Sequence, residues 1–118
     1  MEDMRSYIET NLLNLGCSPG RKGYAYTVRA LEILMEGRAI SCINRELYSL
    51  IATESRTTIL SVERNIRGFV ENLWMEGDHE NLCEIFGKRY ETFRPSNKEF
   101  LFLASRRFLI QLHSPHTV

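Results

Sequence analysis

Apolar residues recur at intervals of three and four along almost the whole of this 118-residue chain, and this spacing restricts the fold severely. On an α-helix such spacing places apolar side chains on one stripe, whereas a half-buried strand requires alternation, which is nowhere sustained. The sequence therefore predicts an all-α fold. Six helices are expected, over about residues 3–15, 23–36, 44–54, 58–75, 78–86 and from 96 onward.

Local signals mark several of the helix boundaries. Ser96 followed by Glu99 matches a capping box, and Pro95 disfavours an earlier start of the last helix. Asp78 and Thr58 are expected to be N-caps, because their side chains can accept hydrogen bonds from amides of the first turn. With no linker and no internal repeat, residues 1–118 are expected to form a single domain.

The composition is that of an ordinary globular protein, with 43% hydrophobic and 25% charged residues. No apolar run is long enough for a membrane span, and the chain lacks a basic signal-peptide start. We expect a soluble, cytoplasmic protein that does not enter membranes. The net charge of zero disfavours non-specific nucleic-acid binding, which requires clustered cations. Such clusters exist locally, at Arg21-Lys22, at Arg56 with Arg64 and Arg67, at Lys88-Arg89 and at Arg106-Arg107.

The cysteines and histidines do not form a recognisable chemical site. Cys17, Cys42 and Cys83 are odd in number and widely spaced, so they are expected to be reduced, buried thiols. His113 and His116 have a spacing that suits a metal but lack further ligands nearby. No nucleophile and base are recognisable by spacing. We therefore expect no metal site, no cofactor and no enzymatic activity.

Residues 45–76 have the properties of a helix-turn-helix. This motif requires a short anchored helix, a tight turn and a second helix with one side buried and the other free to enter the major groove of DNA. Ala52 supplies a small side chain where the two helices must cross, and the turn from Ser55 to Thr58 is short and polar. The second helix, about 58–75, is predicted to be the recognition helix.

The predicted recognition helix has two different faces. Its core stripe comprises Val62, Ile66, Phe69 and Leu73, and the opposite side carries Arg64, Arg67 and Glu71. Arg64 can donate two hydrogen bonds to guanine, and Glu63 can accept one from cytosine. An alternative interpretation is a solvated helix face stabilised by the pairs Glu63–Arg67 and Arg67–Glu71.

A longer pattern extends through the whole chain. It consists of Lys22-Gly23-Tyr24, Tyr26, Tyr48, Ile51-Ala52, Thr57-Thr58, Val62-Glu63-Arg64, Ile66-Arg67, Trp74, Gly77, Phe86-Gly87, Pro95, Asn97 and Glu99-Phe100. In these residues the chain resembles the C-terminal DNA-binding effector domain of the sporulation master response regulator, the stage 0 sporulation protein A family. The resemblance implies a six-helix domain that binds a short DNA box, often as tandem copies or a homodimer, and acts on promoters through RNA polymerase.

The resemblance also implies which residues contact DNA. Glu63, Arg64 and Arg67 match family positions implicated in DNA contact, and Lys22 matches a basic position before the second helix. The family has an arginine in place of Ser61 and a histidine in place of Gly68, so the target sequence is expected to differ. The predicted base-reading residues are Arg64, Glu63, Arg67 and Ser61, and the predicted phosphate-binding residues are Lys22, Arg21, Arg56, Thr57 and Thr58.

Family members carry an N-terminal receiver domain controlled by phosphorylation, and this sequence has no counterpart of it. The chain is either an excised domain or, as its Met1 start favours, a natural receiver-less relative. In the family the receiver restrains the effector, so we expect DNA binding without phosphorylation. The alternative function is an interaction module that pairs with a full-length relative or with RNA polymerase and binds DNA weakly. The acidic segment from Asp78 to Glu84 is the expected polymerase-facing surface.

Overall fold

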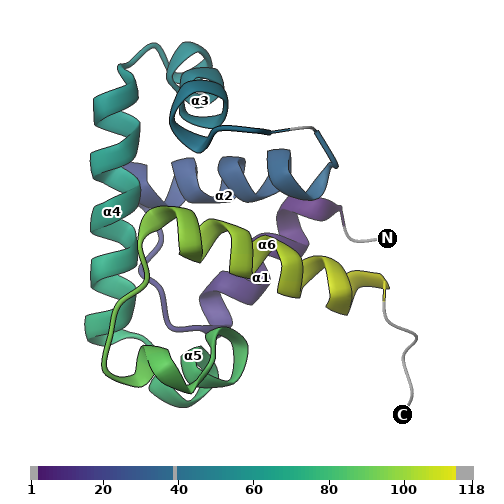
Figure 1. Ribbon diagram of the computed structural model, residues 1–118, viewed down its shortest axis with the longest axis vertical. Helices are drawn as coiled ribbons and strands as arrows, with labels where there is room; N and C mark the ends of the chain where they lie inside the picture. The colour runs from purple at the N-terminus through teal and green to yellow at the C-terminus, as the bar shows by residue number, and fades with distance from the viewer. Residues whose placement is uncertain (1–2, 39, 114–118) are drawn as a thin grey trace.

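The computed structural model describes residues 3–38 and 40–113 (Figure 1). Within these ranges every regular element is a helix, which confirms the predicted all-α fold. The six α-helices are α1 (Met4–Asn14), α2 (Lys22–Met35), α3 (Tyr48–Ser55), α4 (Ile59–Glu76), α5 (His79–Phe86) and α6 (Asn97–His113). None of the helices in the described ranges is long and apolar enough to cross a membrane.

The predicted N-caps are all formed. Thr58 Oγ1 accepts a hydrogen bond from the Ser61 amide at 3.0 Å, and the Asp78 carboxylate accepts one from the Asn81 amide at 3.3 Å. At the start of α6, Ser96 Oγ accepts from the Glu99 amide at 3.1 Å and Glu99 Oε1 accepts from the Ser96 amide at 3.0 Å. These reciprocal bonds are the predicted capping box.

The helix predicted over residues 44–54 differs from expectation in its first turn. Residues Ile43–Leu47 form a π-helix, and α3 continues from there to Ser55. The Tyr48 amide bonds the Ile43 carbonyl, five residues back, and so widens the turn. Glu46 holds the preceding backbone, because its carboxylate accepts from the Ser41 and Cys42 amides at 3.1 and 3.2 Å. A second unpredicted segment, the 3-10 helix Lys88–Glu91, follows α5.

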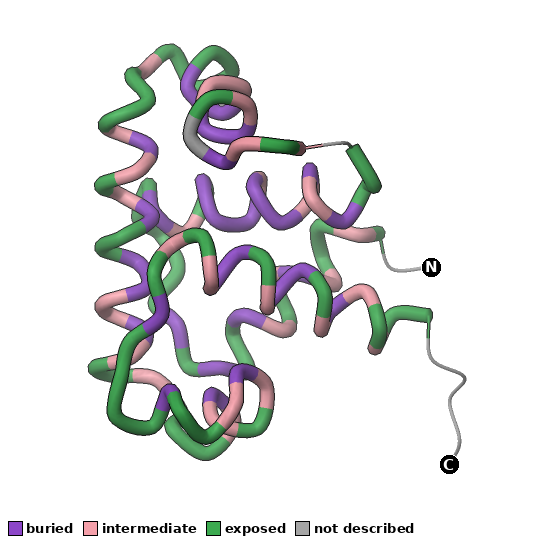
Figure 2. Tube along the Cα trace, in the orientation of Figure 1, coloured by how far each residue is buried: buried purple, intermediate pink, exposed green. Residues whose placement is uncertain are grey.

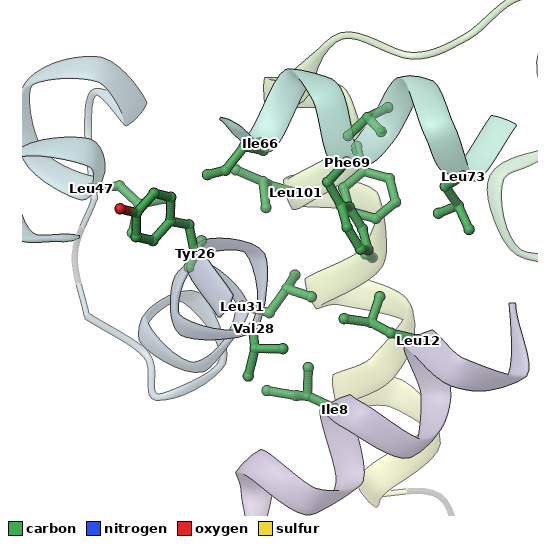
Figure 3. Close-up of a cluster of buried hydrophobic side chains, with 14 of the residues drawn as sticks. Ile8, Leu12, Tyr26, Val28, Leu31, Leu47, Ile66, Phe69, Leu73 and Leu101 are labelled. Carbon is green, nitrogen blue, oxygen red and sulfur yellow. The ribbon is translucent and has the colours of Figure 1, made fainter. Parts of the chain in front are cut away.

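Buried apolar side chains from all six α-helices form the core, and Figure 3 shows part of it. Its buried members include Ile8 and Leu12 of α1, Val28 and Leu31 of α2, Ile66, Phe69 and Leu73 of α4, and Leu101 of α6. An aromatic group continues this core toward α5. In it Trp74 packs edge-on against Phe86 and Phe100, and the Trp74 indole donates to the Tyr90 carbonyl at 3.0 Å.

The arrangement leaves one side of α4 uncovered. In Figure 1, α4 runs along one edge of the molecule, α2 and α6 extend across the fold toward it, and α3 lies near the N-terminal end of α4. Figure 2 shows exposed residues along the outer edge of α4 and buried residues on its inner side. The helix is therefore supported from within and accessible from outside.

Two glycines allow close approach of backbones around α4. A Cβ atom added at Gly23, in the first turn of α2, would lie 2.3 Å from the carbonyl oxygen of Asn65. A Cβ added at Gly77, the C-cap of α4, would lie 2.4 Å from the Leu73 carbonyl oxygen and 2.7 Å from that of Leu15. All three distances are shorter than real Cβ contacts, so any larger residue would force the backbones apart.

The prediction of buried thiols is correct for one cysteine and wrong for two. Cys17 is buried, and burial raises the pKa of its thiol to about 11. Cys42, which precedes the π-helix, and Cys83 of α5 are only half-buried. His113 is exposed at the end of α6, and His116 lies outside the described residues.

Candidate nucleic-acid interface

A tight turn of three residues, 56–58, joins α3 to α4. Arg56 adopts the left-handed conformation with φ 55° and ψ 48°, which costs a non-glycine residue about 1 kcal/mol. The Thr57 amide then reaches back to the Ala52 carbonyl at 2.9 Å and closes the end of α3, as in a Schellman motif. Ala52 itself is buried, in agreement with its predicted place at the helix crossing. The turn thus fixes the direction in which α4 leaves α3.

The predicted core stripe of α4 is buried throughout, from Val62 to Leu73. On the other side lies a row of residues that we call the outer stripe: Leu60, Ser61, Arg64, Arg67, Gly68, Glu71 and Met75. Ser61 and Glu71 are half-buried and the others are exposed. The outer stripe extends over most of the length of α4, which is the geometry that a recognition helix requires.

Two acidic groups, Glu71 on the outer stripe and Glu63 beside it, are each paired with an arginine. Glu63 forms an ion pair with Arg67, as the i to i+4 spacing predicts. The predicted pair between Arg67 and Glu71 is wrong: Glu71 lies 3.4 Å from the guanidinium of Arg94, which arrives from the loop before α6. Sequence spacing cannot reveal this partner, because the contact joins segments far apart in the chain.

Four of the predicted DNA-contacting cations have no internal partner. The side chains of Arg21, Lys22, Arg56 and Arg64 are exposed and make no hydrogen bond or ion pair within residues 3–38 and 40–113. An unpaired guanidinium can bind a ligand without first breaking an interaction of its own. Arg64 is the one such cation on the outer stripe itself, within the described part of the chain.

Unlike Arg64, Ser61 has a hydrogen-bonding neighbour within the fold. Asn65 Nδ2 donates to the Ser61 carbonyl at 2.8 Å, and lies 3.4 Å from the Ser61 hydroxyl. The short hydroxyl therefore has a neighbour on its own helix. Its assignment as a base-reading residue stays a prediction.

Hollows flank the outer stripe on both sides. A pocket of about 150 Å³ brings Arg21, the residue before α2, together with Arg64 and Gly68 of α4. On the other flank, a groove of about 620 Å³ is lined by Glu63 and Arg67 of α4 and by residues from the start of α6. Lys22 lines neither hollow, and Arg56 to Thr58 lie at the N-terminal end of α4.

The groove contains two cations that the sequence analysis does not single out, Arg94 and Lys98. Their position depends on Asn97, whose amide donates to the Glu63 carbonyl at 3.1 Å and joins the start of α6 to α4. Asn97 also reaches the hydroxyl of Tyr48, a buried residue whose pKa is raised by that burial. The capping box at Ser96 predicts where α6 begins, but nothing in the sequence indicates that this helix start packs beside α4.

An ion-pair network holds α3 against α2. Arg29 donates two hydrogen bonds to the Glu54 carboxylate, from Nε and Nη2, both at 2.9 Å. This bidentate contact lowers the pKa of Glu54. Arg29 also pairs with Glu32 at 3.5 Å, and Arg5 of α1 pairs with Glu32 at 2.6 Å. The first helix of the motif is thus connected to α2 and α1 by charged groups as well as by the core.

A short helix, a three-residue turn and a longer helix with an accessible outer stripe define a helix-turn-helix domain of the DNA-binding class. The family comparison agrees with this class. A family model described as "Sporulation initiation factor Spo0A C terminal" matches residues 8–108. The chain belongs to this family, whose members are DNA-binding effector domains of a sporulation regulator. The resemblance seen in the sequence is confirmed.

Proposed function

We propose that this chain is a sequence-specific regulator of transcription that inserts α4 into the major groove and reads guanine with Arg64. The observation that carries the proposal is the state of Arg64: it is exposed on the outer stripe and has no internal partner in the described residues. A guanidinium can donate to both O6 and N7 of guanine, which discriminates against other bases by about 1–3 kcal/mol. Arg64 is therefore assigned the main base-reading role.

Glu63 and Arg67 have a smaller role in this proposal. In the free chain they are paired with each other, so a base contact by either one must replace an existing ion pair. The surface exposure of Arg67 makes this pair weak, and i to i+4 pairs contribute only about 0.3–0.5 kcal/mol. DNA can therefore compete for both side chains. Ser61 contributes a short hydroxyl at the edge of the stripe.

Phosphate contacts are proposed for the cations around α4. Arg21 and Lys22 lie on one flank, and Lys98 with Arg94 lies on the other. Arg56, Thr57 and Thr58 lie at the N-terminal end of α4, where a helix start favours anions. Cations on both sides of a recognition helix suit the two phosphate strands that border a major groove. Such contacts fix the register of the protein without reading sequence.

Selection of bound sequences from a random pool of double-stranded DNA tests this function. The wild-type chain should select a short box, and Arg64→Ala should relax the preference at one base pair. Arg106→Ala is the matched control, because Arg106 is also exposed but lies on α6, away from the outer stripe. An unchanged selected sequence in Arg64→Ala would show that the reading face is assigned wrongly.

We also propose that the 118-residue chain acts in the cytoplasm and binds its box without phosphorylation, singly or as a homodimer or tandem pair. A gel-shift assay on the selected box tests this directly. A complex should form without any phosphodonor. Binding that requires a phosphodonor or a second protein would contradict the proposal.

A second candidate function is an interaction module that pairs with a full-length relative or with RNA polymerase. Gly68 favours it, because this position on the outer stripe has no side chain and open space around it. The exposed acidic residues of α5, Glu80 and Glu84, suit a basic partner surface. Salt dependence separates the two functions. A DNA reader loses affinity as salt rises yet keeps its sequence preference, whereas an interaction module shows neither behaviour with DNA.

A further inference from the structure

Leu60, the second residue of α4, is a large apolar side chain in a place where the core does not need it. It is 55% exposed, and it belongs neither to the buried core nor to the half-buried residues packed against it. It lies one helical turn before Arg64 on the outer stripe. The N-terminal residues of a recognition helix are those that contact base edges in this class of domain. Leu60 therefore stands where bases are read.

Thymine is the base that presents an apolar group in the major groove, its C5-methyl. We propose that Leu60 is a specificity-determining residue that contacts the methyl group of a thymine close to the guanine read by Arg64. The inference rests on the proposed function and adds to it a second base. It also supplies a role for the exposed side chain, because contact with the methyl removes apolar surface of both partners from water.

The helix geometry selects Leu60 over the other exposed apolar residues of α4. At about 100° per residue, Leu60 lies about 40° from Arg64 around the helix, whereas Ile59 lies about 140° away. Along the axis, Leu60 is about 6 Å from Arg64 and Met75 about 16 Å, at a rise of about 1.5 Å per residue. Since Arg64 and Leu60 share a face and a turn, they can reach base pairs within about two steps of each other.

The neighbouring positions leave room for this contact. Ser61 has a short side chain, and Gly68 has none, with no atom within 4 Å of where a Cβ would be. Long side chains at these two positions would compete with Leu60 and Arg64 for the floor of the groove. Their small size lets a leucine and an arginine approach the bases together.

Replacement of thymine by uracil tests the proposal at the level of one methyl group. The substitution is made at each thymine of the selected box in turn and leaves the hydrogen-bonding edges unchanged. For the wild-type chain we expect binding to weaken about fourfold at one thymine within about two base pairs of the guanine, the effect of one buried methyl. Leu60→Ala should bind the thymine and uracil boxes equally at that position, with the guanine preference retained.

The controls separate this inference from the proposed function. Met75→Ala removes another exposed apolar side chain of the outer stripe and should keep the wild-type response to uracil. Leu60→Ser should behave as Leu60→Ala, and circular dichroism should show the wild-type helical content in both. If Leu60→Ala still distinguishes thymine from uracil, or if the wild-type chain never does, Leu60 does not read thymine although DNA binding stands. If the wild-type chain selects no box at all, the proposed function itself fails.

Discussion

Two glycines, Gly23 of α2 and Gly68 of α4, have opposite spatial surroundings. Gly23 packs against the inner side of α4, and Gly68 lies on its outer stripe. At Gly23 the backbones of α2 and α4 are so close that a methyl group would collide with the carbonyl oxygen of Asn65. At Gly68 the added atom would meet open space. The same residue type is thus required at one position and tolerated at the other. Only the three-dimensional packing distinguishes them.

Alanine substitutions at these glycines should change stability in opposite directions. Gly68→Ala should raise the free energy of unfolding by about 1 kcal/mol, because glycine in a helix interior is less favourable than alanine by that amount. Gly23→Ala should lower it by about 1–3 kcal/mol, the usual cost of forcing an extra atom into packed surroundings. Urea denaturation followed by circular dichroism measures both. Equal stability of Gly23→Ala and wild type would contradict the close approach.

Single residues also show how far sequence reasoning extends. The exposure of Arg64 and the pair between Glu63 and Arg67 follow from helical spacing alone, and the structure has both. The partner of Glu71 does not follow from spacing, because Arg94 reaches it through the tertiary fold. Local periodicity thus predicts which side of a helix a residue occupies. It does not predict which residues from distant parts of the chain contact that side of the helix.

At the scale of elements, α3 depends on a charged contact as well as on apolar packing. Its last turn carries Glu54, held by Arg29 of α2, and the turn to α4 begins directly afterwards. Because the pKa of Glu54 is lowered in the folded state, the pair stabilises the fold at pH values above the ordinary carboxyl pKa of 4.5. This contribution is lost as the pH falls through the lowered pKa of the folded state.

Glu54→Gln should therefore lower the free energy of unfolding at neutral pH. It should also make that free energy depend less on pH in the acidic range. We expect a loss below about 1 kcal/mol at pH 7, since the Glu54 side chain is 43% exposed and solvent screens the pair. Well below pH 4, variant and wild type should converge. Urea denaturation at several pH values measures this. A difference that persists unchanged at low pH would show that the effect does not arise from the Glu54 charge.

The boundaries of elements were predictable where a side chain caps the helix. Thr58, Asp78 and Ser96 all act as N-caps, as their sequence contexts indicate. The π-helix before α3 was not predictable, because it depends on the Ile43 carbonyl accepting from an amide five residues ahead. Apolar spacing is too coarse to distinguish this turn from an α-helical one.

At the scale of the whole molecule, all six α-helices contribute to one continuous core. The proposal that residues 1–118 form a single domain predicts one cooperative unfolding transition. Fluorescence of Trp74, which lies in the aromatic group near α5, and far-ultraviolet circular dichroism, which reports all helices, should give the same midpoint. Two separate midpoints would show that the region around α5 unfolds independently of the helix-turn-helix.

The class of fold and the exposed face of α4 could be predicted from the sequence, but the groove that Arg94 and Lys98 line beside it could not. The flanking groove arises because Asn97 fixes the start of α6 to the backbone of α4. This contact brings Lys98 beside a helix that precedes it by more than twenty residues. The sequence shows that residue 98 is a lysine, but it does not indicate that this lysine lies beside α4.

The contact at Gly23 is made between two backbones, so it does not depend on which side chains occupy the outer stripe. Under the proposed function, mutations that alter the bases preferred by α4 can therefore accumulate while Arg21 and Lys22 keep their place beside it. Relatives could diverge in target sequence and still attach to DNA in the same pose. A laboratory evolution of new specificity should accordingly begin with Leu60, Ser61 and Gly68 and leave Gly23 unchanged.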